Sequence, residues 1–135
     1  MRLQGKTVIV TGSGSGFGEG IAKTFAREGA NVFVNDLNRA AAERVASEIV
    51  LVSSAEVKHG RTITVQGDVT KRKDWQKLHD AAINDFGSVQ VVVNNAGTTH
   101  RSAQSGRRAL RMIGVFLRPI STWRACHRAR ILTRL

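Results

Sequence analysis

The chain has 135 residues, a net charge of +11 and 41% hydrophobic residues, a balance that indicates one modest globular domain rather than a disordered chain. No stretch approaches the roughly 18 to 20 apolar residues of a membrane span, and residues 1–6 lack the apolar run of a signal peptide. We therefore expect no membrane partner and a cytoplasmic location. The single cysteine, Cys126, excludes an internal disulfide.

The positive charge is concentrated in the last quarter of the chain. Residues 1–100 contain 12 basic and 10 acidic side chains, whereas residues 101–135 contain nine arginines, no lysine and no acid. A basic extension of this kind is one route to nucleic-acid binding. It contains one aromatic pair, Phe116 and Trp123, and no recognisable nucleic-acid-binding module, so we favour other functions over this alternative.

The first hundred residues alternate between strand and helix patterns. Short runs rich in β-branched residues predict strands at 7–10, 31–35, 62–66 and 89–94. Helical spacing between these runs predicts one apolar face per helix, formed by Phe17, Ile21 and Phe25, then Ala41, Val45 and Ile49, then Trp75, Leu78, Ala82 and Phe86. Thr70 is the expected N-cap of the third helix.

This alternation predicts an α/β fold, namely the N-terminal half of a Rossmann-like doubly wound parallel sheet. Because parallel crossovers are right-handed, the expected strand order is 3-2-1-4, with a ligand at the carboxyl ends of the strands. We expect a partial dinucleotide-binding domain over residues 1–100 and an irregular Arg-rich tail over 101–135. The fourth strand would then present an apolar edge unless the tail covers it, and an open edge favours self-association.

The most informative segment is the glycine-rich run of residues 11–18, Thr-Gly-Ser-Gly-Ser-Gly-Phe-Gly, between the first strand and the first helix. Its spacing is G-x-x-x-G-x-G, at Gly12, Gly16 and Gly18; neither G-x-G-x-x-G nor a P-loop fits. Glycines that turn a strand into a helix direct backbone N–H groups and the positive helix end into one space. The run therefore predicts a pyrophosphate site.

Polar residues follow the other three strands. Asp36 ends the second strand, where a carboxylate can accept hydrogen bonds from an adenosine ribose and repel a 2′-phosphate, which favours NAD over NADP. Asp68 closes the third strand near an expected adenine, and Asn95 closes the fourth. Three alternatives stay open: Asp36 as a helix N-cap, Asp68 as a brace for a turn, and Asn95 as a tie between neighbouring strands.

Taken in order, Thr-Gly-x-x-x-Gly-x-Gly, an acid after the second strand, Asp-Val after the third and Asn-Asn-Ala-Gly after the fourth resemble the short-chain dehydrogenase/reductase family. The resemblance covers roughly residues 3–99. Within the family, this segment is similar to the 3-oxoacyl-carrier-protein reductases. It implies hydride transfer between a nicotinamide and an alcohol or carbonyl. The cofactor-binding residues that it implies are Gly12, Ser15, Gly16, Phe17, Gly18, Asp36, Asp68, Val69, Asn95, Ala96 and Gly97.

The resemblance also implies catalytic residues that this sequence does not contain. The family uses a tyrosine with a lysine four residues later, yet the chain has no tyrosine and no lysine after Lys77. We therefore assign no catalytic residue and no metal ligand, and expect an NAD-binding chain that is inactive by itself. A small-molecule substrate is expected only in a full-length relative. The acid-free tail further suggests a frameshift or truncation in the gene; a cofactor-binding or interaction protein without chemistry is the alternative function.

Overall fold

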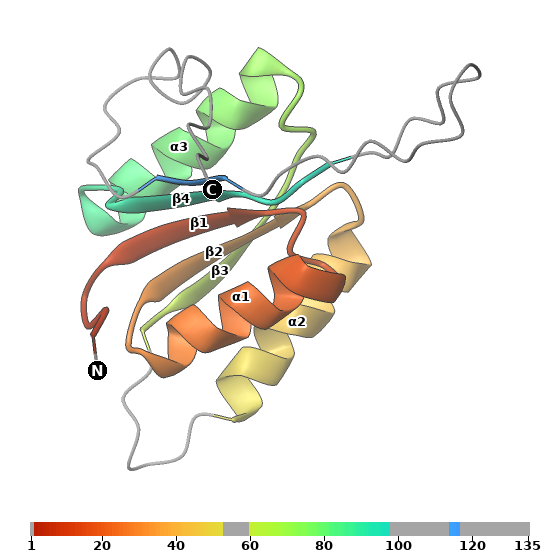
Figure 1. Cartoon of the computed structure of the whole chain (residues 1–135). Helices are drawn as coiled ribbons and strands as arrows, with labels where there is room; N and C mark the ends of the chain where they lie inside the picture. The colour runs from red at the N-terminus through yellow and green to blue at the C-terminus, as the bar shows by residue number, and fades with distance from the viewer. Residues whose placement is uncertain (1, 53–59, 98–113, 117–135) are drawn as a thin grey trace, which may run out of the picture.

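The computed structural model describes residues 2–52, 60–97 and 114–116. Strands and helices alternate along the chain up to the fourth strand (Figure 1). The elements are β1 (Thr7–Thr11), α1 (Gly16–Arg27), β2 (Asn31–Asp36), α2 (Arg39–Leu51), β3 (Thr62–Gln66), α3 (Arg72–Phe86), β4 (Val91–Asn94) and β5 (Gly114–Phe116). No helix in these ranges is long and apolar enough to cross a membrane.

The strands form one sheet with the order β3-β2-β1-β4-β5. Parallel pairing joins β1 to both β2 and β4, and β2 to β3. The predicted α/β fold and the strand order 3-2-1-4 are therefore confirmed. Because β1 and β4 are neighbours in space but not in sequence, the chain reverses its winding between them, and their carboxyl ends meet at the point where such sheets bind ligands.

Two helices cover one face of the sheet and the third covers the other (Figure 1). On the face of α1 and α2 the core is made of small and aliphatic side chains, among them Val8, Val10 and Ala22. On the face of α3 the core contains bulkier groups, including Phe33 and Trp75. All five residues of β1 are buried, as expected for a central parallel strand that is apolar on both sides.

The fifth strand modifies the expectation for the edge of β4. Residues 114–116, within the tail that was expected to be irregular, pair with β4 in antiparallel fashion, with Val92 opposite Phe116 and Asn94 opposite Gly114. This is the outcome in which the tail covers the β4 edge. The expected self-association stays a prediction, and the rest of the tail lies outside the described residues.

Three local expectations are corrected by the structure. Helix α1 buries Gly18, Ala22 and Ala26, whereas Phe17 is 81% exposed and does not belong to the apolar face. The N-cap of α3 is Lys71 rather than Thr70. The N-cap of α2 is Asn38, whose side chain accepts a hydrogen bond from Ala41 N, so the alternative role of Asp36 as that N-cap is wrong.

Candidate functional site

The glycine loop passes close to the ends of β1 and β4, and its glycines make that approach sterically feasible. Gly12 has φ +62°, and a Cβ there would lie 2.8 Å from Ala96 Cα. A Cβ on Gly18 would collide with the Gly12 carbonyl and the Asn95 side-chain amide. Side chains at either position would therefore force the loop, α1 and the end of β4 apart.

Ser15 is the N-cap of α1, and its side chain makes no capping hydrogen bond. Gly16 follows with φ +58°, and a Cβ at that position would point into open space. The first N–H groups of a helix have no intrahelical partners and carry the positive end of the helix dipole. The loop therefore presents a free helix end to an anion, which is the arrangement that the glycine spacing predicts.

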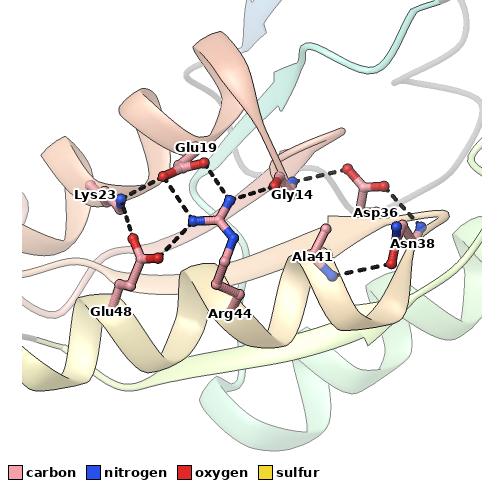
Figure 2. Close-up of polar contacts among 8 residues, drawn as sticks. All are labelled: Gly14, Glu19, Lys23, Asp36, Asn38, Ala41, Arg44 and Glu48. Atoms are coloured by element: carbon pink, nitrogen blue, oxygen red, sulfur yellow. Dashed lines mark hydrogen bonds and ion pairs between the residues drawn. The ribbon is translucent and has the colours of Figure 1, made fainter.

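The carboxylate of Asp36 is held by two backbone N–H groups. Gly14 N donates to Asp36 Oδ2 at 2.9 Å, and Asn38 N donates to Asp36 Oδ1 at 2.9 Å (Figure 2). A carboxylate has about four lone-pair positions, so two accepted bonds leave capacity for further donors such as ribose hydroxyls. The two N–H groups orient this carboxylate at the end of β2, beside the glycine loop.

The ends of β1 and β4 are joined by side-chain hydrogen bonds. Asn95 Nδ2 donates to the carbonyls of Thr11 and Gly12, at 3.1 and 2.9 Å. The Thr11 hydroxyl accepts from the N–H groups of Asn95 and Ala96, and donates to Val93 O. The structure thus confirms the alternative in which Asn95 ties neighbouring strands.

Asp68 braces the turn that leads into α3. Its Oδ1 accepts from the Thr70 hydroxyl at 2.6 Å and from Thr70 N at 3.0 Å. These two bonds, the hydroxyl's first, lower the pKa of the Asp68 carboxyl below its ordinary value of 3.8. The bracing role is therefore observed, and Asp68 also faces the cavity described next.

A cavity of about 360 Å³ opens at the carboxyl ends of the strands. It brings together eight of the eleven residues that the sequence predicts for cofactor binding: Gly12, Ser15, Asp36, Asp68, Val69, Asn95, Ala96 and Gly97. The other three, Gly16, Phe17 and Gly18, lie in the first turn of α1 next to Ser15 and are not part of its lining. Gly18 instead packs against the inner side of the loop, and Phe17 projects into solvent.

The structure also shows three residues, not predicted from the sequence, whose hydrogen bonds join segments around the site. Ser13 is fully buried and binds Asn35 through both backbone and hydroxyl, which joins the loop to β2. Asn35 in turn donates to Val65 O and Gly67 O, which joins β2 to β3. Arg44 of α2 reaches Gly14 O. No local sequence pattern predicts these contacts, because each joins residues more than twenty positions apart in the chain.

The residues present fit a dinucleotide. A pyrophosphate needs backbone N–H donors within reach of one small space, and the start of α1 supplies such donors. The glycines let this helix start lie close to the ends of β1 and β4, because a Cβ at Gly12 or Gly18 would collide with Ala96 or with the Gly12 carbonyl. A ribose needs an acceptor, and the oriented Asp36 carboxylate lines the same cavity. Among the described residues, no group of three or more His, Cys, Asp or Glu side chains could hold a metal ion. The arrangement can bind and orient a cofactor, but it contains no tyrosine to move a proton.

The chain is similar in sequence to known dehydrogenases. The 7alpha-hydroxysteroid dehydrogenase of Escherichia coli K12 is 41% identical over 97 residues, which are 72% of this chain and 36% of that protein. The 4-formylbenzenesulfonate dehydrogenase of Comamonas testosteroni is 43% identical over 102 residues, 76% of this chain and 38% of that protein. The chain therefore spans little more than a third of the length of these two relatives.

A solved structure provides a match in three dimensions. The 3-ketoacyl-(acyl-carrier-protein) reductase from Brucella melitensis, solved in complex with NADH, superposes with a TM-score of 0.62 at 43% identity, over 73% of this chain and 36% of the reductase. The sequence profile of the family described as short chain dehydrogenase matches residues 6–112. The predicted domain boundary near residue 100 stays a prediction. By its sequence, its fold and the order of its motifs, the chain belongs to the short-chain dehydrogenase family.

Proposed function

We propose that this chain binds a nicotinamide dinucleotide in the cavity at the carboxyl ends of the strands, and that it prefers NAD to NADP. The observation that carries the preference is the Asp36 carboxylate, which lines the cavity and is oriented by two N–H groups. An ionised acid there can accept hydrogen bonds from ribose hydroxyls and would repel a 2′-phosphate. Arg39, the nearest base along the chain, donates to Glu43 at 2.6 Å.

The proposal divides the cofactor among segments of the site. The glycine loop and the first turn of α1 would bind the pyrophosphate and its neighbouring ribose, through Gly12, Ser15, Gly16, Phe17 and Gly18. Asp36 would hold the adenosine ribose, and Asp68 and Val69 would lie against the adenine. Asn95, Ala96 and Gly97, at the end of β4, would lie against the middle of the cofactor. The nicotinamide supplies hydride transfer in this family.

We further propose that the 135-residue chain binds without turnover. Proton transfer to or from the reacting oxygen in this family needs a tyrosine, and the sequence contains none. The cavity residues supply hydrogen-bond acceptors and backbone donors, which suit binding rather than acid-base work. Mixing the chain with NADH and a panel of carbonyl compounds should leave the absorbance of the reduced nicotinamide unchanged; cofactor oxidation that follows protein concentration would contradict this.

Calorimetric titration of the chain with NAD and with NADP tests the binding proposal. NAD should bind more tightly than NADP. Asp36→Ala should weaken NAD binding about 10- to 100-fold, because hydrogen bonds to a charged acceptor contribute about 1.5–3 kcal/mol. It should weaken NADP binding less, since it also removes a repulsion. Asp80→Ala, which removes an exposed acid on α3, is the matched control and should change neither affinity. Equal NAD affinity in the Asp36 variant and the unsubstituted chain would overturn the proposal.

A further inference from the structure

Four charged side chains form a closed network between α1 and α2 (Figure 2). Lys23 and Arg44 each bridge the same two carboxylates, those of Glu19 and Glu48. The Arg44 guanidinium uses both of its terminal nitrogens, with Nη2 at 2.7 Å from Glu19 Oε2 and Nη1 at 2.6 Å from Glu48 Oε1. These contacts fix the plane of the guanidinium, which can then direct a further N–H at a chosen acceptor.

That further N–H is directed at the glycine loop. Arg44 Nη2 donates to Gly14 O at 3.0 Å, while Gly14 N donates to Asp36 Oδ2 at 2.9 Å. Gly14 is thus bonded on both sides of its backbone, to α2 through Arg44 and to the end of β2 through Asp36. A Cβ at Gly14 would lie 2.8 Å from Asp36 Oδ2 and 2.9 Å from Ala41 Cβ, so the loop approaches both elements closely.

We propose that Arg44 is a positioning residue that holds the glycine loop in its cofactor-ready conformation before any ligand arrives, and through Gly14 orients Asp36. The inference rests on the proposed function for its consequence in binding, but not for its effect on the loop. Four of the eight residues from 11 to 18 are glycines, and an unrestrained glycine loop has many conformations. A loop already held in place avoids the entropic cost of ordering when the dinucleotide binds.

Lys23 provides a matched control. It bridges the same two carboxylates as Arg44 and carries the same charge, but among the described residues its Nζ is bonded to Glu19 and Glu48 and not to the glycine loop. Lys23→Met and Arg44→Met therefore remove one positive charge each from the same network. Only the Arg44 substitution removes the donor to Gly14 O. A difference between the two variants reports on the loop contact rather than on charge or on the pairing of α1 with α2.

The first experiment measures hydrogen exchange at the Gly14 amide by NMR in the full 135-residue chain without dinucleotide. Arg44→Met should speed exchange about fivefold to tenfold, as expected for losing about 1 kcal/mol of hydrogen bonding that holds the loop. Lys23→Met should leave the rate within about twofold. Arg44→Lys keeps the positive charge but loses the planar guanidinium, so its Gly14 exchange rate should lie between those of the two Met variants. If Arg44→Met does not fold, Arg44→Lys takes its place in the comparison. Equal Gly14 exchange in the Arg44 and Lys23 variants would overturn the proposal.

The second experiment compares NAD and NADP affinities in the same proteins. A misoriented Asp36 discriminates less well, so Arg44→Met should lower NAD affinity about tenfold and lower the ratio of NAD to NADP affinity. Lys23→Met should not lower that ratio. Equal changes of the ratio in the two variants mean that only charge matters, which contradicts the proposal. If the unsubstituted chain binds neither dinucleotide, the proposed function fails, and Gly14 exchange still decides the role of Arg44.

Discussion

The two faces of the sheet are packed in different ways. On one face α1 and α2 approach β1 and β2 through small side chains such as Ala22, Ala26 and Ala42, all of them buried. On the other face α3 packs Trp75 and Leu78 against the sheet. There Phe33 meets Phe86 edge to face, with ring centroids 5.7 Å apart. Both faces bury aliphatic side chains, but the largest buried groups, Phe33 and Trp75, lie on the α3 face, and buried alanines of α1 lie on the other.

The difference reflects what each face must allow. Helix α1 begins directly after the glycine loop, and its first turn must lie against the end of β1 so that the loop can form the wall of the cavity. Side chains larger than alanine in the buried row of α1 would lift the helix from the sheet. Helix α3 does not follow the glycine loop, and bulky side chains fill the space between this helix and the sheet. The two faces should therefore fail in opposite ways when side chains change size.

Removing buried bulk from the α3 face should have the largest effect on stability. Leu78 is 1% exposed, and Leu78→Ala should lower the free energy of unfolding by about 3 kcal/mol, because it deletes buried methyl groups and leaves a cavity. Leu51→Ala, on the α2 side, removes the same atoms from a residue that is 82% exposed and should change the free energy by less than about 0.5 kcal/mol. Urea unfolding of both variants measures the difference. Similar midpoints would contradict the contrast between buried bulk and exposed bulk.

Adding bulk should be most damaging on the α1 face. Gly18→Ala places a Cβ against the Gly12 carbonyl and the Asn95 amide, and should cost about 2 kcal/mol of stability as backbone and strand end move apart. Gly20 lies two residues later in the same helix, and a Cβ there meets nothing within 4 Å. Gly20→Ala should therefore stabilise the chain by about 1 kcal/mol through helix propensity. Thermal unfolding of the two variants should show shifts of opposite sign; shifts of the same sign would contradict close packing at Gly18.

The same contrast explains which parts of the fold could be predicted from the sequence. The row of Trp75, Leu78 and Ala82 has helical spacing and large side chains, so its burial was predicted correctly. In α1 the prediction placed Phe17 on the apolar face because its side chain is large and hydrophobic. The buried residues of that helix are instead Gly18, Ala22 and Ala26. Small residues carry a weak hydrophobic signal, although they mark the closest approach of a helix to a sheet.

The candidate site divides in a similar way. Residues at strand ends and in the glycine loop could be predicted, because strand order alone brings Gly12, Asp36 and Asn95 to one edge of the sheet. The contact of Arg44 with Gly14 could not, since it depends on how α2 lies against α1. The sequence shows the helical pair Arg44 and Glu48 at positions i and i+4, a spacing typical of exposed helix surfaces. Nothing in that spacing indicates that the arginine also reaches a loop thirty residues earlier.

The smallest expected effect concerns the charges that join α1 to α2. Arg44, and then Lys23, donate hydrogen bonds that lower the pKa of Glu19 from its ordinary 4.5 to about 2. A carboxyl with a depressed pKa stabilises the folded chain above its unfolded pKa, and this contribution is lost as pH falls from about 4.5 to about 2. Because Glu19 remains 20% exposed, solvent screening should limit the contribution to about 1 kcal/mol.

Glu19→Gln should therefore flatten the loss of stability between pH 4.5 and 2, while the variant is less stable than the unsubstituted chain at neutral pH. Thermal unfolding midpoints measured across this range for both proteins give the comparison. The α3 face offers an internal reference, because Leu78→Ala alters packing rather than an ionisable group and should shift the midpoint by a similar amount at every pH. If the unfolding midpoint of Glu19→Gln falls with pH in parallel with that of the unsubstituted chain, the ion pairs of Glu19 contribute nothing to stability beyond the packing of α1 against α2.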